Sequence, residues 1–285
     1  MYRFELFEEE KLLNPDLVER ILKDSYNDHP ELETSDPLIS KNHKRIIENA
    51  LNDMDVCQAE ATNPFQPAEI STELAQKMPV LWVLSGSGNT KEPFLDSEPN
   101  YYRHPHNEWG NANRLIKAHK IALSIAYAKS GLKKFSVAPE EIPEFLEYCG
   151  PTIFYNGYAE QCDDLVEAAK SGRFNFPPSK IVVCRNPEIQ RTGDQVKEEN
   201  FLTSPLLAQL QGGTLGIVSH GLHLPRIYRL MFANNLNKKG FDIKGFGVSS
   251  KPEHLENYAY HEAKGILAYT LNGSCADVSI HRRNI

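Results

Sequence analysis

The chain has 285 residues, a formal net charge of −7 at pH 7 and hydrophobic residues at 40% of its positions. These values are typical of a globular protein that is long enough to bury a large core. The mildly acidic balance disfavours general nucleic-acid binding, which requires a basic face, but it permits a small anionic ligand held by a few local cations.

Residues 1–78 are predicted to form a helical N-terminal extension that packs on the main domain. Two short amphipathic patterns, at residues 17–22 and 46–54, carry this prediction. The sequence contains neither an apolar signal core near residue 1 nor a run of about 18 apolar residues. The five cysteines are scattered and form no Cys-x-x-Cys pair, which favours reduced thiols. We therefore expect a cytoplasmic protein that does not span a membrane.

Five short apolar runs follow Pro79, and helical patterns lie between them. Such runs are typical of strands covered on both faces, and the alternation of strand and helix predicts a parallel sheet. Residues 79–285 are therefore predicted to form a Rossmann-like α/β domain with a parallel sheet of about five strands and helices on both faces. The expected strands are 80–84, 152–155, 180–184, 214–218 and 242–246, and the expected helices are 114–129, 162–169, 196–210, 225–236 and 254–271.

The first candidate ligand loop follows the first predicted strand. Open parallel sheets bind ligands at the carboxyl ends of their strands, near the point where the strand order reverses. The loop reads Ser85-Gly86-Ser87-Gly88-Asn89, and its glycines would let a ligand approach the backbone N–H groups. It lacks the G-x-G-x-x-G pattern and a Walker lysine, so a plain turn is an equal alternative. The long segment 89–109 that follows is a candidate lid or rim.

The second candidate loop ends in Thr192-Gly193-Asp194-Gln195. A threonine followed three residues later by a glutamine fits a capping box, so Thr192 is the expected N-cap of a helix. The same helix start would offer N–H groups and the Asp194 carboxylate to a ligand. The two interpretations are compatible with each other.

The third candidate loop runs from Ser219 to Arg226. Pro225 suits the first turn of a helix, which places Arg226 where the helix dipole disfavours a cation. We therefore expect an anion beside Arg226, either a carboxylate such as Asp194 or the anionic group of a ligand. His220 and His223 form an H-x-x-H in a loop without a nearby carboxylate, so no metal is expected. His223 is the candidate proton donor, because imidazole titrates near neutrality.

The order of these motifs resembles the YdcF/SanA/ElyC family of bacterial proteins over residues 79–271. Residues 83–88 are similar to the family's first loop, Asn156-Gly157 stands at its Ser-Gly-Gly, and residues 218–226 match its His-x-x-Arg turn most closely. Further similar positions are Arg114, Thr192, Asp194, Gln195, Glu262 and Gly265-Ile266-Leu267. The resemblance is closest to the soluble YdcF branch. It implies a Rossmann-like fold and S-adenosylmethionine or another nucleotide-like ligand.

The leading hypothesis is a protein that binds a small anionic, nucleotide-like ligand, with Arg226 and Arg114 neutralising the ligand's charge. Asp194 would orient Arg226 or accept a ribose hydroxyl. The alternatives are a hydrolase or phosphatase of a phosphorylated metabolite and a non-catalytic interaction protein, so enzymatic activity stays open. The candidate catalytic residues are His223 and Asp194, and the candidate ligand-binding residues are Ser85, Gly86, Ser87, Gly88, Asn89, Arg114, Asn156, Gly157, Thr192, Gly193, Gln195, Ser219, His220 and Arg226.

Overall fold

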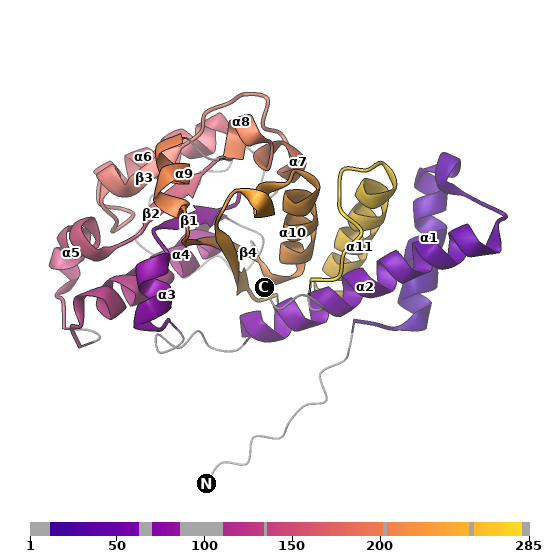
Figure 1. Ribbon diagram of the computed structural model, residues 1–285, viewed down its shortest axis with the longest axis horizontal. Coiled ribbons are helices and arrows are strands. Elements are labelled where there is room, and N and C mark those ends of the chain that lie inside the picture. Colours follow the sequence, from indigo (N-terminus) through magenta and orange to yellow (C-terminus); the bar gives the residue numbers. More distant parts are fainter. Residues whose placement is uncertain are drawn as a thin grey trace, which may run out of the picture.

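Five strands form a single all-parallel sheet in the order β3-β2-β1-β4-β5 in this computed structural model (Figure 1). The structure describes residues 12–62, 70–85, 111–133, 136–201, 204–250 and 254–280. The predicted strands are all present, so the Rossmann-like α/β class is confirmed. Their bounds are β1 Val80–Val83, β2 Thr152–Tyr155, β3 Ile181–Val183, β4 Thr214–His220 and β5 Asp242–Val248.

The strand order reverses at the centre of the sheet. β1 pairs with β2 on one side and with β4 on the other, and the chain then proceeds outward to β3 and β5 respectively. The topological switch point therefore lies between β1 and β4. In sheets of this kind, ligands bind outside the carboxyl ends of the two strands that flank the switch point.

The sheet is covered by helices on both faces. All four residues of β1 are buried, and they alternate between two core clusters, because successive side chains of a strand point to opposite faces. Leu81 and Val83 pack with α4 and α6, whereas Val80 and Trp82 pack with α9 and α10. These helices are α4 Asn111–Ser130, α6 Ala159–Lys170, α9 Ser204–Leu210 and α10 Leu224–Ala233.

The single helix expected over residues 196–210 is wrong. The chain instead forms three short helices. Pro205, which has no backbone N–H for a helical hydrogen bond, lies in the first turn of the third helix, and the Asn156 side chain binds carbonyl oxygens of the other two. Asn156 Nδ2 donates to the carbonyl oxygens of Gln195 (2.7 Å) and Asn200 (2.6 Å). The three helices are α7 Thr192–Gln195, α8 Glu198–Phe201 and α9, and the sequence patterns also missed α3 Thr72–Lys77 and α5 Ile142–Cys149.

The N-terminal region contributes two helices that pack on the last helix of the chain. They are α1 Pro15–Asp28 and α2 Pro37–Thr62, and they share a third core cluster with α11 Leu255–Leu271. Figure 1 shows α1, α2 and α11 together at one end of the molecule. The amphipathic patterns of residues 17–22 and 46–54 are thereby confirmed, whereas the domain boundary at residue 79 stays a prediction. No helix of the described part of the chain is both long and apolar enough to cross a membrane.

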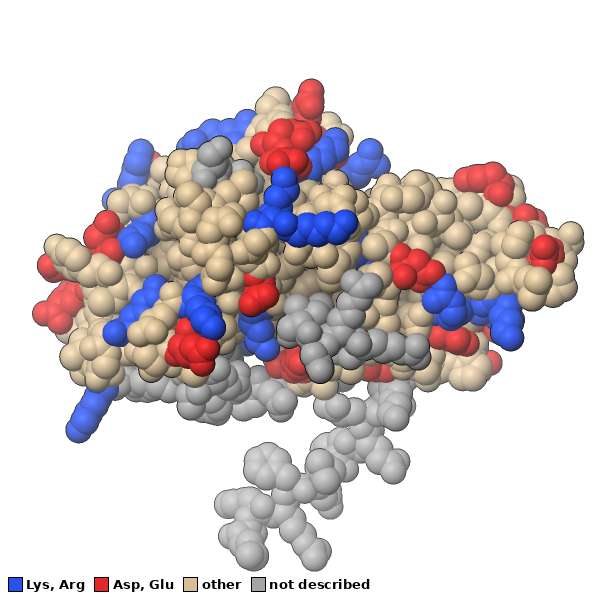
Figure 2. Space-filling view, viewed as in Figure 1, with Lys and Arg blue, Asp and Glu red and all other residues tan. Residues whose placement is uncertain are grey.

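Charged side chains of both signs are interspersed over the described part of the face shown in Figure 2. Exposed ion pairs occur on the surface of the protein, such as Arg185 with Asp163 at 2.6 Å. Exposed pairs of this kind contribute little to stability, with values of roughly 0–1 kcal/mol. Charges buried at the carboxyl end of the sheet interact more strongly, because they are less screened by water.

Candidate functional site

The carboxyl ends of β1, β2 and β4 bring together most of the candidate residues that the structure describes. Leu84 extends β1 by donating its backbone N–H to Val218 of β4 (3.1 Å). Ser85 therefore follows directly on the sheet at the switch point, while Ser219 and His220 end β4 beside it. Gly86, Ser87, Gly88, Asn89 and the segment 89–109 lie outside the described residues.

Gln195 links the ends of β1 and β2. Its Nε2 donates to the Ser85 hydroxyl and to the backbone oxygen of Asn156, the latter at 3.2 Å. The Asn156 side chain also accepts from Trp82 Nε1 at 2.8 Å, so its oxygen and nitrogen are both engaged by protein groups. Asn156 therefore organises the loop, whereas the buried Gln195 Oε1 has no hydrogen-bond partner among the described residues.

Gly157 is required by the close approach of the loop after β2 to the loop after β1. A Cβ built at this position would lie 2.7 Å from Ser85 Cβ and 2.7 Å from the Tyr155 hydroxyl oxygen. Such contacts are well below ordinary van der Waals separation, so a larger residue would push these loops apart. Gly193 differs, because a Cβ there would meet no atom within 4 Å.

Arg114 is a buried cation at the end of β1. It extends from α4, retains 2% exposure and donates from Nη1 to the backbone oxygen of Leu84 at 2.8 Å. Its Nε has no hydrogen-bond partner, and no ion pair joins it to a carboxylate of the described residues. Burial lowers the pKa of this guanidinium to about 10, so it stays charged at neutral pH.

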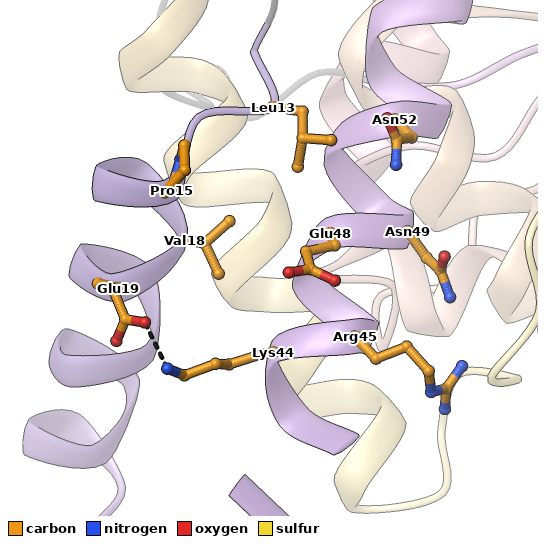
Figure 3. A pocket seen from close by; sticks show the side chains of 9 residues that line it. All are labelled: Leu13, Pro15, Val18, Glu19, Lys44, Arg45, Glu48, Asn49 and Asn52. Atoms are coloured by element: carbon orange, nitrogen blue, oxygen red, sulfur yellow. Dashed lines mark hydrogen bonds and ion pairs between the residues drawn. The ribbon is translucent and has the colours of Figure 1, made fainter. Parts of the chain in front are cut away.

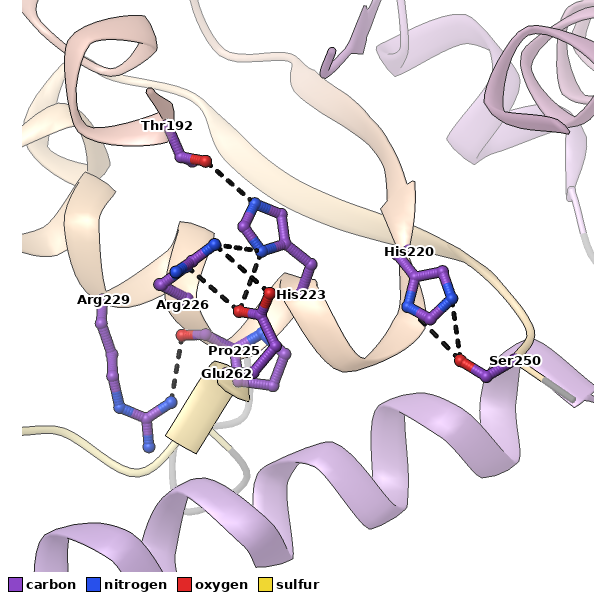
Figure 4. Close-up of polar contacts among 8 residues, drawn as sticks. All are labelled: Thr192, His220, His223, Pro225, Arg226, Arg229, Ser250 and Glu262. Carbon is purple, nitrogen blue, oxygen red and sulfur yellow. Dashed lines mark hydrogen bonds and ion pairs between the residues drawn. The ribbon is translucent and has the colours of Figure 1, made fainter. Parts of the chain in front are cut away.

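His223 lies at the centre of a polar cluster that we call the second cluster, to distinguish it from the groups around Gln195 and Arg114. Its other members are Thr192, Arg226 and Glu262 (Figure 4). Its Nε2 lies 3.1 Å from the Thr192 hydroxyl, and its Nδ1 lies 3.0 Å from Glu262 Oε2. Arg226 reaches the same carboxylate, with Nε 3.1 Å from Oε2 and Nη2 3.3 Å from Oε1. The anion expected beside Arg226 is therefore present, and it is Glu262 of α11.

The expectations about the start of α7 need two corrections. Thr192 is the first helical residue and Arg191 is the N-cap. Asp194 supplies the capping, since its Oδ2 accepts from the backbone N–H groups of Gln190 and Arg191, both at 3.2 Å. Asp194 also pairs with Lys197 at 3.1 Å, so its carboxylate serves α7 instead of Arg226.

The protonation states in the second cluster follow from burial and pairing. Burial lowers the pKa of His223, although Glu262 opposes the change, so the imidazole is neutral at pH 7. Burial would raise the pKa of Glu262, but the charge of Arg226 and the hydrogen bond with His223 outweigh it and hold the pKa at about 2. The cluster thus combines an ionised carboxylate, a guanidinium and a neutral imidazole.

His220 lies apart from this cluster, although it is only three residues from His223. It is fully buried, and its Nε2 lies 2.8 Å from the Ser250 hydroxyl. Burial, followed by the charge of Arg114, lowers its pKa to about 3. Among the described residues, no group of three or more histidine, cysteine, aspartate or glutamate side chains is arranged to hold a metal ion.

Glu262 was absent from the candidate site residues, although the motif resemblance placed it in the terminal helix. It lies 36 residues after Arg226, and no local pattern connects two positions that far apart. Apart from the resemblance, the signal in the sequence is a glutamate at a position that falls on the otherwise apolar face of the last predicted helix, because a carboxylate on such a face requires a partner.

A separate surface pocket of about 450 Å³ lies between α1 and α2 (Figure 3). Both of its cations already have carboxylate partners, since Lys44 pairs with Glu19 and Arg45 pairs with Asp277. The orphaned polar atoms at the end of the sheet make that region the stronger candidate for a ligand site.

Comparisons with known proteins do not add to this picture. No family model matches the chain, and neither a curated protein nor a solved structure does. The resemblance to the YdcF/SanA/ElyC family therefore stays a prediction from the order of the motifs.

Proposed function

We propose that this chain binds a small anionic, nucleotide-like ligand at the carboxyl ends of β1 and β4. The observation that carries the proposal is a set of buried polar atoms without hydrogen-bond partners at this end of the sheet. They are Arg114 Nε, Gln195 Oε1 and Ser219 Oγ. Because buried polar atoms in folded proteins nearly always have a partner, atoms gathered at a switch point favour a polar ligand there.

The buried charges support an anionic ligand. Arg226 and Glu262 compensate each other as an ion pair, and burial keeps His220 and His223 neutral at pH 7. Arg114 is then left as a buried positive charge that no described carboxylate pairs with directly. A buried charge without a partner is costly, and an anionic group on a ligand would offset that cost.

The roles of the two arginines therefore differ from those expected from the sequence. Arg226 has its anion within the protein, so it orients Glu262 and His223. Arg114 is the better candidate for the ligand's phosphate or carboxylate, because its Nε is free to donate. Gln195 Oε1 and Ser219 Oγ would bind the hydroxyl and ring N–H groups that a nucleoside offers.

A thermal-shift and calorimetric screen tests the proposal. The probes are S-adenosylmethionine, S-adenosylhomocysteine, AMP, ADP and inorganic phosphate. A ligand present at about 100 times its Kd adds roughly 2.7 kcal/mol to the free energy of unfolding. We expect at least one nucleotide-like probe to stabilise the protein well beyond the effect of phosphate.

Two substitutions make this test specific to the site. Arg114→Gln removes the proposed anion-binding charge and should abolish the response to the ligand. Arg45→Gln removes an exposed cation on α2 and is the matched control that should respond like the wild type. A response that survives Arg114→Gln unchanged, or the failure of every probe to stabilise the wild type, would overturn the proposal.

A further inference from the structure

The Thr192 hydroxyl, the His223 imidazole and the Glu262 carboxylate form one hydrogen-bonded chain (Figure 4). The Thr192 oxygen is 3.1 Å from Nε2, and the opposite ring nitrogen, Nδ1, is 3.0 Å from Glu262 Oε2. A hydroxyl, an imidazole and a carboxylate in this order are the arrangement by which many enzymes activate an oxygen nucleophile.

The three groups differ in their access to a substrate. Thr192 is half-buried, whereas His223 and Glu262 are each 4% exposed. Thr192 is therefore the least buried of the three residues, which favours its hydroxyl as the group that a substrate would meet. The imidazole and the carboxylate are held behind it, away from water, where their mutual interaction is strong.

The charges around His223 suit a base that is neutral at rest. In the tautomer whose proton is on Nδ1, that nitrogen donates to the Glu262 carboxylate and the lone pair of Nε2 is directed at the Thr192 hydroxyl; this is the tautomer that the inference requires. Arg226 Nη2 lies 3.0 Å from Nδ1 and 3.3 Å from Glu262 Oε1. Its charge disfavours a permanently protonated imidazole, while the carboxylate stabilises the imidazolium that forms transiently.

From this geometry we infer that Thr192 is the nucleophile in the hydrolysis of a small anionic carboxylic ester. This inference rests on the proposed ligand site, because Arg114 would bind the anionic part of the ester. It narrows the hydrolase hypothesis to carboxylic esters. Attack on a carbonyl carbon requires a nucleophile and a base, and Thr192 and His223 would supply them.

The reaction proceeds in two balanced steps. Thr192 Oγ bonds to the carbonyl carbon while its proton passes to His223 Nε2, and the alcohol leaves with that proton when the carbon–oxygen bond of the ester breaks. Water then attacks the acylated Thr192, gives one proton to Nε2, and releases the acid as Thr192 recovers its proton. One ester and one water are consumed, and one acid and one alcohol are formed.

The test compares three chromogenic esters: 4-nitrophenyl hemisuccinate, 4-nitrophenyl acetate and 4-nitrophenyl phosphate. We expect the wild-type protein to hydrolyse the carboxylic esters and to prefer the anionic hemisuccinate. Turnover of the phosphate ester alone would overturn the assignment to carboxylic esters, and turnover of none would overturn the inference altogether.

Substitution of Thr192 provides the specific evidence. Thr192→Ala should lower kcat by about 10³-fold or more, whereas Thr192→Ser should retain turnover. Thr72 is also the first residue of a short helix, α3, so Thr72→Ala is the matched control and should behave like the wild type. Rapid quenching followed by mass spectrometry should find the succinyl group on the peptide that carries Thr192. Unchanged turnover in Thr192→Ala would exclude it as the nucleophile.

Glu262 is inferred to be a positioning residue that acts through His223. Glu262→Gln keeps the side-chain volume but removes the charge, so kcat should fall by about 10²-fold or more with a much smaller change in KM. Its pH profile should also shift, because the base then loses the carboxylate that raises its pKa. A loss confined to KM, with an unchanged pH profile, would contradict this role.

The two proposals fail in distinguishable ways. Thr192→Ala leaves Arg114 intact, so nucleotide-dependent stabilisation should persist in this variant. If nucleotides stabilise the protein but no carboxylic ester is hydrolysed, only the hydrolytic inference fails. If esters are hydrolysed through Thr192 but no anionic probe stabilises the protein, the proposed ligand site fails instead.

Discussion

At the scale of single residues, the two histidines of the loop after β4 show how burial and partners divide similar side chains between different tasks. His223 contacts a hydroxyl and a carboxylate, which suits it for proton transfer. His220 contacts the Ser250 hydroxyl and packs edge-on against Tyr258, with ring centroids 5.7 Å apart. Burial lowers the pKa of both, so neither carries a charge at neutral pH.

The depressed pKa of His220 predicts an acid-sensitive fold. Its pKa falls from about 6.5 in the unfolded chain to about 3 in the folded protein, mainly through burial. Between these values the unfolded state binds more protons, so the stabilising effect is complete above pH 6.5 and is lost as the pH falls. The slope contributed by this one group is close to zero above pH 6.5 and approaches about 1.4 kcal/mol per pH unit as the pH falls below that value. Urea denaturation at pH 7.5, 6.5 and 5.5 measures it.

The control for this prediction is a pair of variants. His220→Gln should flatten the dependence of the unfolding free energy on pH, whereas His29→Gln replaces an exposed histidine and should leave it unchanged. If the slopes of the wild type and His220→Gln coincide, the buried imidazole is not the group responsible.

At the scale of elements, α2 is joined to α10 by a buried ion pair between Asp53 and Arg229. The two side chains are 1% and 2% exposed. Asp53 also accepts from the Ser279 hydroxyl (3.1 Å) and the Ile280 backbone N–H (3.3 Å). One carboxylate therefore ties together the N-terminal helices, a helix that covers the sheet and the segment after α11.

Removing one charge of this pair is predicted to cost far more than removing one charge of an exposed pair. Asp53→Asn leaves a buried guanidinium without its counter-ion, and the expected loss is about 3–5 kcal/mol. Asp277→Asn, which disrupts the exposed Arg45–Asp277 pair, is the matched control and should cost at most about 1 kcal/mol. Chemical denaturation measures both, and equal losses would show that the buried pair is dispensable.

At the scale of the whole molecule, the N-terminal helices support the loop that carries both histidines. Leu222, between His220 and His223, belongs to the core cluster that α1 and α2 share with α11. A Cβ at Gly221 would lie 3.1 Å from Ala61 Cβ and 3.2 Å from the Cys57 backbone oxygen, both in α2. The loop that carries both histidines therefore follows directly on β4 of the sheet and packs against α2 of the N-terminal extension.

This arrangement predicts that residues 79–285 do not fold stably by themselves. Without α1 and α2, Leu222 and the apolar side of α11 would be exposed to solvent. Arg229 would also lose its buried ion pair with Asp53. We expect the shortened chain to be insoluble or to lack a cooperative thermal transition by circular dichroism. Addition of residues 1–78 as a separate chain should restore the transition. Cooperative unfolding of the shortened chain alone would show that the extension is an independent attachment.

Local sequence patterns determined the class of the fold. The apolar run at residues 80–84 indicates a strand covered on both faces, because successive side chains of a strand point to opposite faces and here all of them are apolar. Pro225 likewise marked the start of α10 and placed Arg226 in its first turn. Those predictions were correct because they depend only on interactions between residues close in the chain.

The site itself was decided by the tertiary structure. Glu262 meets Arg226 and His223 only because α11 packs beside α10, and Asn156 binds the carbonyl oxygens of Gln195 and Asn200 only because β2 ends beside α7 and α8. The sequence predicted that an anion lies beside Arg226, since a cation in the first turn of a helix is unfavourable. Which carboxylate supplies that anion depends on helix packing across 36 residues, and such long-range contacts leave no mark in a local pattern.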